Sequence, residues 1–420
     1  MYEPLEHPPV AVVAPFPREE VVVLEEPQAV AYAVPPPPPP PPQGAEPNPK
    51  ARRGHAVDVI CVRRCTGELA CSEWGVRFAM PSSLTRNMAR AYESMASSFA
   101  RLGGRQRSFS EDENFDEEMD APATVVASVN GRVVPGLELH FERDGSCSFG
   151  RLRLKPTSSE LELCGLREGK NALRVELSRG KRLDVAHARI FLWRRDDPVM
   201  VCDVDGTITR TDVRGFVDSV VAEAPSNAHA GVCEFFGDLA DDRRANILYL
   251  TSRPIALADL TRNFIATLQQ PQYERFGDPR RAWRRMPDGP VVTSRANIVG
   301  ALYSELVAKT PDVFKTKALL DVNQAYEALA FKAGFGNRHT DCKAYARAGI
   351  PVDAIYLIDP NSTITVPFRR PDATAPPFFG YADPRLRAVV AAALTRCAPL
   401  PRPLMRAPSG GIILTRSTSV

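Results

Sequence analysis

The sequence lacks several features that would place it in a familiar class. It has no run of about 18 apolar residues, and its start shows neither the basic residues nor the unbroken apolar stretch of a signal peptide. We therefore expect neither a transmembrane helix nor a secretory leader. Its nine cysteines are odd in number and scattered, without paired C-x-x-C motifs or histidines at zinc spacing, which favours a reducing compartment. The only cysteine cluster, Cys61, Cys65 and Cys71, fits an ordinary strand and turn better than a metal site.

The chain also lacks a strong excess of charge. A net charge of +3 argues against a dedicated nucleic-acid binder, although it leaves local basic patches free to meet other anions. The 44% hydrophobic and 25% charged residues are typical of globular protein, so the 39 prolines are the one strong deviation. At 420 residues there is room for two ordinary domains and some loose segments.

Proline and charge divide the chain into folded and unfolded parts. Residues 1–53 form a proline-rich tail that ends near the run 35–42, which favours polyproline II or disorder. This tail is either a solubilising arm or a ligand for a proline-binding domain. Residues 82–121 are too charged to bury and are predicted to be a disordered insertion, and 371–420 form a partly disordered C-terminal extension with one helix at 384–396.

Residues 54–195 have the texture of an antiparallel β-sandwich unit. Turns are predicted at Thr66-Gly67 and at Asn130-Gly131, the second being a strong hairpin signal. Residues 55–78 complete either one sandwich with 124–195 or a separate patch. The predicted strands are 57–63, 74–78, 124–129, 137–141, 146–152, 172–177 and 188–193.

Residues 196–370 change to apolar runs separated by amphipathic stretches, which indicates an α/β fold with a parallel sheet and crossover helices. The predicted strands are 199–202, 246–250, 291–292, 330–335 and 354–358, and the predicted helices are 256–268, 298–307 and 316–329.

The sharpest chemical motif, Asp203-Val-Asp205-Gly206-Thr207, directly follows the apolar strand 199–202. Ligands of open α/β sheets gather at the carboxyl ends of strands, so both carboxylates would face the same ligand. Asp203 would attack phosphorus, and Asp205 would protonate the leaving alkoxide and later deprotonate water. Gly206 allows a tight turn, and Thr207 offers a hydroxyl and an amide to the phosphate. The alternative is a turn or a calcium-like loop.

Three further segments could join this motif. Thr251 ends the second strand and could bind a phosphate oxygen, or it could simply cap a helix. Lys315 could neutralise a pentavalent transition state, or it could be an ordinary solvated lysine. Asn337 and Asp341, four residues apart, offer the hard oxygen ligands that Mg²⁺ prefers.

The order of these motifs resembles the four motifs of the haloacid dehalogenase superfamily. More closely, residues 203–212, LYLTSRPIALADLT at 248–261, 311–315 and 335–349 resemble the catalytic domain of lipins, the Mg²⁺-dependent phosphatidate phosphatases. Residues 55–78 resemble the lipin N-terminal domain. Together the similar segments span about residues 54–80 and 124–370.

This resemblance implies a haloacid-dehalogenase-like (Rossmann-like) catalytic domain at 196–370 after an immunoglobulin-like β-sandwich unit at 54–195. The implied reaction is phosphatidate plus water to diacylglycerol plus phosphate, in glycerolipid and triacylglycerol synthesis. The implied location is cytoplasmic, at the endoplasmic reticulum surface, with the nucleus as a second site. The implied catalytic residues are Asp203, Asp205, Thr251 and Lys315, with Lys309 and Lys317 competing for the lysine role, and the implied Mg²⁺ ligands are Asp203, Asp205, Asn337 and Asp341.

The chain departs from the lipin pattern in three places. The proline tail stands where lipins carry an amphipathic membrane helix, which leaves the grip on the membrane open. Residues 213–217 replace the L-x-x-I-L segment of lipin coactivators, so we do not predict coactivation. The long regulatory middle of many lipins is reduced to the 82–121 insertion.

Two surface features suggest partners. Ser108 and Ser110 precede an acidic run that suits an acidophilic kinase, unless the insertion is a passive linker. Arg280, Arg281, Trp283, Arg284 and Arg285 combine cations with an interfacial aromatic, which suits anionic lipid headgroups but also an ordinary surface loop.

Two other functions remain open on the sequence alone. Phosphatidylinositol-transfer proteins carry a related domain that binds phosphatidic acid without hydrolysing it, but such domains lack an intact acid pair. A phosphatase of the same superfamily could instead act on a soluble phosphomonoester, because the motifs define chemistry better than substrate.

Overall fold

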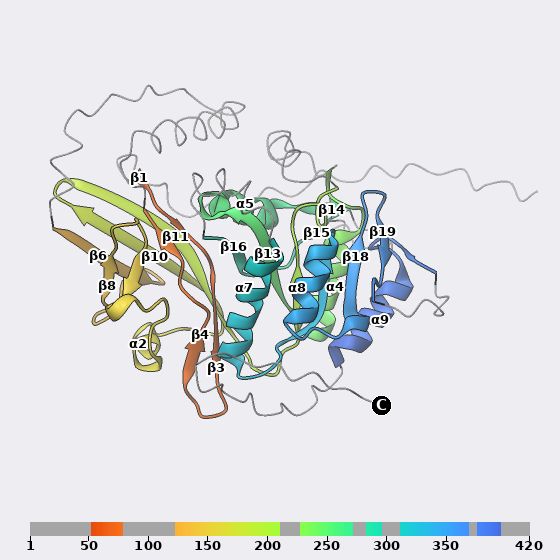
Figure 1. Cartoon of the computed structure of the whole chain (residues 1–420), viewed down its shortest axis with the longest axis horizontal. Coiled ribbons are helices and arrows are strands. Elements are labelled where there is room, and N and C mark those ends of the chain that lie inside the picture. The colour runs from red at the N-terminus through yellow and green to blue at the C-terminus, as the bar shows by residue number, and fades with distance from the viewer. Residues whose placement is uncertain are drawn as a thin grey trace, which may run out of the picture. The chain divides into compact units, whose positions relative to one another are not determined.

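A computed structural model describes residues 52–78, 122–210, 227–271, 283–295, 311–368 and 376–395 (Figure 1). The predicted proline tail, the 82–121 insertion with Ser108 and Ser110, and the predicted helix at 298–307 lie outside these residues. The described parts form a mixed α/β structure with two large sheets, one mostly antiparallel and one mostly parallel.

The first sheet is organised around a long hairpin, β10 (Gly169–Arg179) and β11 (Arg182–Trp193). β6 (Ala123–Val129) pairs with β10, and Asn130 and Gly131 then turn the chain into β7 (Arg132–Val133). Both turn residues have positive φ, 50° and 78°, as a two-residue hairpin requires, so the predicted turn is confirmed.

Two details of this sheet differ from the prediction. The predicted strand 146–152 ends early, as β9 (Cys147–Phe149), and continues in a 3₁₀ turn because Leu152 adopts a φ of 59° that an extended strand does not use. In addition, β1 (Arg52–Arg53) and β3 (Val59–Arg63) pair parallel to β11, so the sheet is not purely antiparallel. The sheet is completed by β4 (Leu69–Cys71) and β8 (Leu139–Phe141).

Residues 55–78 belong to the same β unit and do not form a separate patch. β2 (His55–Ala56) and β5 (Val76–Arg77) form a small sheet, and the N–H of Phe78 donates to the carbonyl of Gly145 at 2.8 Å. The ring of Trp74 packs edge-on against Phe149, with centroids 5.3 Å apart. One buried core thus unites both segments.

The second sheet has the order β16-β13-β12-β17-β18-β19-β20 and is parallel from β16 to β18. Its central strand β12 is buried at every position, as a continuous apolar run in a parallel sheet predicts. All five predicted strands are confirmed, four of them with shifted ends, and β19 and β20 were not predicted. The strands are β12 (Val199–Cys202), β13 (Asn246–Pro254), β16 (Val291–Ser294), β17 (Phe331–Gly336), β18 (Ile355–Ile358), β19 (Thr363–Thr365) and β20 (Phe378–Phe379).

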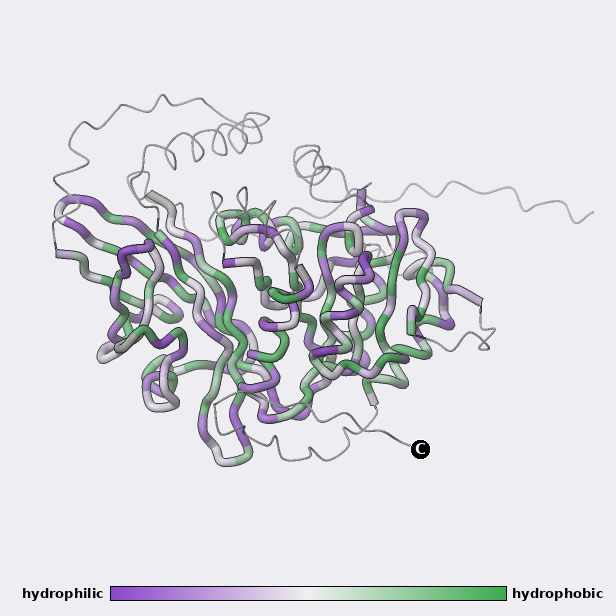
Figure 2. The backbone as a smooth tube through the Cα atoms, in the orientation of Figure 1, coloured by the Kyte–Doolittle hydropathy of each residue, from purple (hydrophilic) through white to green (hydrophobic). Residues whose placement is uncertain are grey.

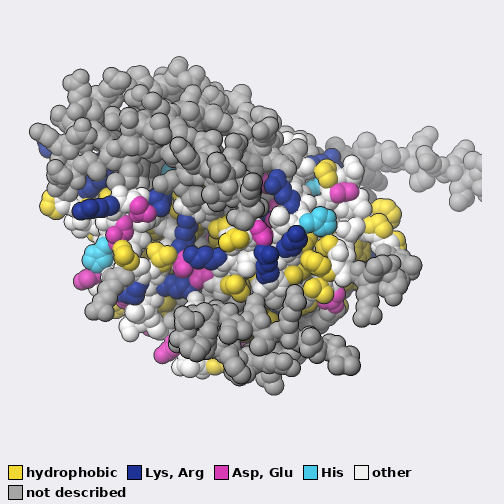
Figure 3. Space-filling view, viewed as in Figure 1, with side chains coloured by type: hydrophobic (Ala, Val, Ile, Leu, Met, Phe, Trp, Pro, Cys, Tyr) yellow, Lys and Arg dark blue, Asp and Glu magenta, His cyan; other side chains and the backbone are white. Residues whose placement is uncertain are grey.

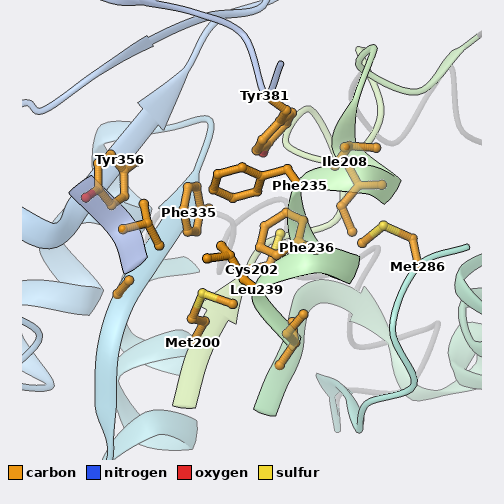
Figure 4. Packing of buried hydrophobic residues seen from close by; sticks show 14 of the residues in the cluster. Met200, Cys202, Ile208, Phe235, Phe236, Leu239, Met286, Phe335, Tyr356 and Tyr381 are labelled. Atoms are coloured by element: carbon orange, nitrogen blue, oxygen red, sulfur yellow. The ribbon is translucent and has the colours of Figure 1, made fainter. Parts of the chain in front are cut away.

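Helices cover this sheet, and apolar clusters lie on both of its faces. Figure 4 shows one of these clusters, in which the rings of Phe235, Phe236, Phe335, Tyr356 and Tyr381 pack together above Met200 and Cys202. Figure 2 shows the corresponding hydrophobic stretches along the central strands.

Three of the predicted helices are present, and three helices among the described residues were missed. The confirmed helices are α5 (Ala258–Thr267), preceded by η4 (Ile255–Leu257), α7 (Pro311–Tyr326) and α9 (Pro384–Thr395). The missed helices are the short α2 (Ser158–Leu163) of the β unit, α4 (Val232–Arg243) and α8 (His339–Arg347). A small two-stranded sheet of β14 (Gln269–Pro271) and β15 (Trp283–Arg285) was also missed. No helix among the described residues is long and apolar enough to cross a bilayer.

A buried carboxylate joins the β unit to the α/β unit. Asp58, between β2 and β3, accepts hydrogen bonds from the guanidinium of Arg189 on β11 at 2.6 and 3.0 Å and from Arg262 on α5 at 3.2 Å. It also accepts from the backbone N–H of Val291 on β16 at 2.8 Å. Burial opposes ionisation, but the two guanidinium groups outweigh it and hold the pKa of Asp58 below its usual range.

Replacing Asp58 with alanine should destabilise the protein strongly, because two guanidinium groups would lose their shared buried carboxylate. We expect a loss of about 3–5 kcal/mol in the free energy of unfolding, measured by urea titration followed by circular dichroism. The matched control is Glu162→Ala, which removes a pair with Arg63 whose two side chains are about half exposed and which should cost about 0–1 kcal/mol. Equal losses in the two variants would contradict the proposed importance of this junction.

Candidate active site

The predicted site residues meet at the carboxyl ends of the parallel strands. Asp203 directly follows β12, and its backbone N–H still donates to the carbonyl of Phe335 on β17, at 2.9 Å. Thr251 lies within the adjacent β13, and Asn337 directly follows β17. This edge of the sheet is where open α/β folds bind their ligands.

Lys315 connects two of the three carboxylates. Its ammonium group donates to Asp203 Oδ1 at 2.6 Å and to Asp341 Oδ1 at 2.7 Å, and all three side chains are buried. The geometry thus distinguishes Lys315 from Lys317, whose side chain is 72% exposed and lies near Glu73. Lys309, the other competing lysine, lies outside the described residues.

Burial and charge act in opposite directions on these groups. Burial raises the pKa of Asp203 to about 7, because Lys315 only partly offsets the desolvation and the neighbouring Asp341 and Asp205 carboxylates add to it. Burial also disfavours the charged form of Lys315, but Asp203 and Asp341 outweigh that effect and raise its pKa above the usual value. Lys315 therefore stays a cation. Additional positive charge nearby would stabilise the ionised form of Asp203.

Asp205 has a separate set of partners. Thr251 donates to its Oδ2 at 3.0 Å, and Arg253 donates through Nε to the same oxygen at 2.9 Å and through Nη2 to Oδ1. Arg253 is completely buried, and the sequence analysis assigned it no role. Its signal in the sequence was its place two residues after Thr251, on the same strand.

The loop between Asp203 and Thr207 is tightly packed. Gly206 has a φ of 78°, and a Cβ at this position would lie 1.9 Å from Asn337 Nδ2. The hydroxyl of Thr207 donates to Asp203 Oδ2 at 3.4 Å. The predicted Asn337 and Gly206 are therefore in direct van der Waals contact, which ties the loop after β12 to the segment after β17.

Two further residues, His229 and Tyr381, support this loop. The buried His229 places Nε2 3.4 Å from the carbonyl of Gly206 and Nδ1 2.8 Å from the hydroxyl of Ser362. The hydroxyl of Tyr381 donates to the carbonyl of Thr207 at 3.0 Å. Neither residue lies within a recognisable motif.

Asp341 has a structural role besides its contact with Lys315. Its Oδ2 accepts from the backbone N–H of Arg338 at 3.0 Å, which completes a cap at the start of α8. Gly336 is needed nearby, because a Cβ there would lie 2.6 Å from the Cβ of Asp341. The end of β17 and the start of α8 thus hold this carboxylate toward Lys315.

The donors at this edge of the sheet fit Mg²⁺. Within the described ranges, no three His, Cys, Asp or Glu side chains form a metal-binding group. Asp203 and Asp341 nevertheless share one ammonium and so face a common point, and the Asn337 amide lies against the same loop. Two carboxylates and an amide are the hard oxygen donors that Mg²⁺ takes together with retained waters. Asp205, the fourth predicted ligand, is instead bound to Arg253 and Thr251.

Two other predicted features lie away from this edge. Cys61 and Cys71 are opposite each other on β3 and β4, and burial raises the pKa of Cys61 to about 12, so it remains a neutral thiol. In the basic cluster, Arg284 donates to Asp238 at 2.8 Å and to Asp241 at 2.7 Å, so two neighbouring carboxylates balance its positive charge. Arg280 and Arg281 lie outside the described residues.

The parallel sheet and its edge of carboxylates around a buried lysine define an α/β domain with an oxygen-rich, cation-compensated site. Comparison with protein families identifies the family within this class. The family described as LNS2 (Lipin/Ned1/Smp2) matches residues 152–373, more than half of the chain, and the chain belongs to this family. The match begins within the β unit, so it includes β10 and β11 as well as every strand of the second sheet except β20.

Individual relatives agree with this family. Nuclear elongation and deformation protein 1 of Schizosaccharomyces pombe is 33% identical over 210 residues, which is 49% of this chain and 30% of the relative. Phosphatidic acid phosphohydrolase 1 of Saccharomyces cerevisiae is 31% identical over 223 residues, 50% of this chain and 24% of the relative. Phosphatidate phosphatase PAH1 of Arabidopsis thaliana is 32% identical over 217 residues, 51% of this chain and 22% of the relative. The matched region therefore spans less than a third of each of these relatives.

Replacing Gly206 with alanine should cost more stability than the same change at Gly131. Both glycines have a φ of 78°, but a Cβ at Gly131 would meet nothing within 4 Å. The shared backbone strain is worth about 1–2 kcal/mol, and the collision with Asn337 should add about 1–3 kcal/mol at Gly206 alone. Urea unfolding of both variants measures the difference. Adding Asn337→Ala to Gly206→Ala should recover part of the loss, and no recovery would show that the contact is not the cause.

Proposed function

We propose that this chain is a Mg²⁺-dependent phosphatidate phosphatase that hydrolyses phosphatidic acid to diacylglycerol and phosphate in glycerolipid synthesis. The observation that carries the proposal is the ion-paired group of Asp203, Lys315 and Asp341 at the end of the central strand. Asp205, which supplies a further carboxylate, follows Asp203 by two residues. The printed names of the yeast and plant relatives, a phosphatidic acid phosphohydrolase and a phosphatidate phosphatase, supply the substrate.

The first chemical step transfers the phosphoryl group to the protein. Asp203 attacks phosphorus through a carboxylate oxygen while the bond between phosphorus and the glycerol oxygen breaks, and Asp205 gives its proton to that oxygen. Lys315 donates to Asp203 and supplies positive charge beside the reacting group. Thr207 and Thr251 lie beside the two aspartates, where their hydroxyls could orient phosphate oxygens.

The second step returns the protein to its starting state. Asp205, now a carboxylate, takes a proton from water as the water oxygen attacks phosphorus and the bond to Asp203 breaks. Mg²⁺ held by Asp203, Asp341 and Asn337 would supply positive charge against the phosphate oxygens. Asp203 and Asp205 are both largely buried, so the attacking water would reach them through a restricted opening.

The finer assignments of fold belong to the same proposal. The α/β unit would be a haloacid-dehalogenase-like domain, and the β unit an immunoglobulin-like sandwich. The buried core that unites residues 55–78 with β8 to β11 supports one sandwich-like unit. The boundary near residue 195 would separate these two units, although the family match extends across it.

The enzyme would meet its substrate at the cytoplasmic surface of the endoplasmic reticulum, with the nucleus as a second site. Anionic headgroups would be its membrane partners, and a kinase acting on Ser108 and Ser110 would regulate the contact by adding negative charge. On the face shown in Figure 3, Lys and Arg side chains are interspersed with acidic ones.

Phosphate release from phosphatidate in mixed micelles tests the activity. Wild type should release phosphate with Mg²⁺, and Asp203→Asn should lower the rate by at least about 1,000-fold because no nucleophile remains. Asp144→Asn, at a side chain that is 61% exposed, is the matched control and should behave as wild type. Binding of phosphatidate vesicles without turnover would favour the binding-module alternative, and faster turnover of soluble phosphomonoesters would favour the soluble-substrate alternative.

The metal site has its own test. Asn337→Ala should weaken Mg²⁺ binding by at least about tenfold, because the proposed amide oxygen ligand is lost. Isothermal titration calorimetry with MgCl₂ measures this affinity directly and without substrate. Asn263→Ala, on the exposed face of α5, serves as the control. Unchanged Mg²⁺ affinity in Asn337→Ala would remove Asn337 from the ligand set.

A further inference from the structure

Arg253 is a buried cation that the mechanism above does not use. Its side chain has no exposed surface, and it holds Asp205 through a two-pronged contact, with Nε 2.9 Å from Oδ2 and Nη2 bonded to Oδ1. A forked guanidinium contact fixes both the position and the plane of a carboxylate, which a single hydrogen bond does not. Arg253 thus determines which way the carboxyl group of Asp205 faces.

The other end of the guanidinium is fixed as well. Nη1 of Arg253 donates to the hydroxyl of Thr261 at 2.9 Å, and that hydroxyl donates to the carbonyl of Leu257 at 2.9 Å. Thr261 is fully buried on α5. The guanidinium of Arg253, which comes from the end of β13, therefore contacts Asp205 through two of its nitrogens and Thr261 of helix α5 through the third.

Helix α5 is itself held by the β unit. Arg262, the residue after Thr261, donates to Asp58 at 3.2 Å and to the backbone carbonyls of Ala56 at 3.0 Å and His187 at 2.8 Å. Adjacent residues of one helix thus contact the β unit and the arginine that holds Asp205. A continuous set of polar contacts runs from the β unit to the acid of the active site.

We propose that Arg253 is a positioning residue for the acid–base step, with its own orientation set by Thr261 and, through α5, by Asp58. This inference rests on the proposed function, in which Asp205 gives a proton to the glycerol oxygen as the bond to phosphorus breaks. That transfer leaves a carboxylate on Asp205, and the Arg253 fork stabilises the new charge and keeps the carboxylate aimed for the proton it next takes from water.

A pair of lipid substrates separates this role from a general structural one. The first is phosphatidate, whose leaving alkoxide needs a proton. The second is its analogue with sulfur in place of the bridging oxygen, whose thiolate leaves without one because thiols are much stronger acids than alcohols. Both are presented in the same mixed micelles with Mg²⁺, so binding and micelle contact are matched.

In single-turnover experiments, which follow only the first step, Arg253→Gln should lower the rate of diacylglycerol release from phosphatidate on the order of 100-fold and leave the rate of thiol release from the sulfur analogue close to wild type. Asp205→Asn should show the same selective loss. Thr261→Val, which removes only the anchoring hydroxyl, should show a smaller loss with the same selectivity. Arg253→Lys keeps the positive charge but not the two-pronged contact, and its rate on phosphatidate should lie between those of wild type and Arg253→Gln.

The control is Arg385→Gln, which removes a similar two-pronged contact with Asp383 from a side chain that is 45% exposed, and it should leave both rates unchanged. Circular dichroism and unfolding midpoints establish which variants fold, and Thr261→Val and Arg253→Lys carry the test if Arg253→Gln does not. Equal losses on the two lipids in the folded variants would overturn the positioning role alone. A wild-type protein inactive on both lipids would overturn the proposed function together with this inference.

Discussion

The structure of the site depends on one buried charge balance, the ammonium of Lys315 shared between Asp203 and Asp341. Two carboxylates brought this close in a water-poor environment repel each other and lose their hydration, so they need a cation between them. The lysine supplies it from α7, while Asp203 comes from β12 and Asp341 from α8. Three separate elements must therefore pack correctly before the charges are compensated, which couples the order of the parallel sheet to the chemistry at its edge.

The second acid is compensated independently. Arg253 and Thr251 hold Asp205, so each aspartate of the pair has its own cation and the two can take different roles although they are two residues apart. This division agrees with a mechanism in which one carboxylate attacks and the other moves protons. It also explains why the two neighbouring aspartates need not act as one metal-binding pair.

Much of this arrangement could be predicted because parallel sheets leave a clear pattern. Continuous apolar runs such as 199–202 marked the strands, and the residues just after them marked the site. Helix α8 could not be found this way because it is short (His339–Arg347), begins in the polar segment around Asp341 and contains few strongly apolar side chains. Helix α4 carries Val232, Phe235, Phe236 and Leu239 at helical spacing and could have been predicted. His229 was missed because its role arises from contacts between distant segments, whereas Arg253 could have been suspected from its place two residues after Thr251.

The β unit is assembled from two pieces of chain, residues 52–78 and 122–193, that share one core and pair side by side. The entropy of closing a connection between fixed ends grows slowly, by only about 0.6 kcal/mol for each doubling of its length. A segment placed between these pieces can therefore lengthen or shorten greatly in evolution while the fold that receives it keeps nearly the same stability. Proteins of this family can thus differ several-fold in overall size and still build the same scaffold.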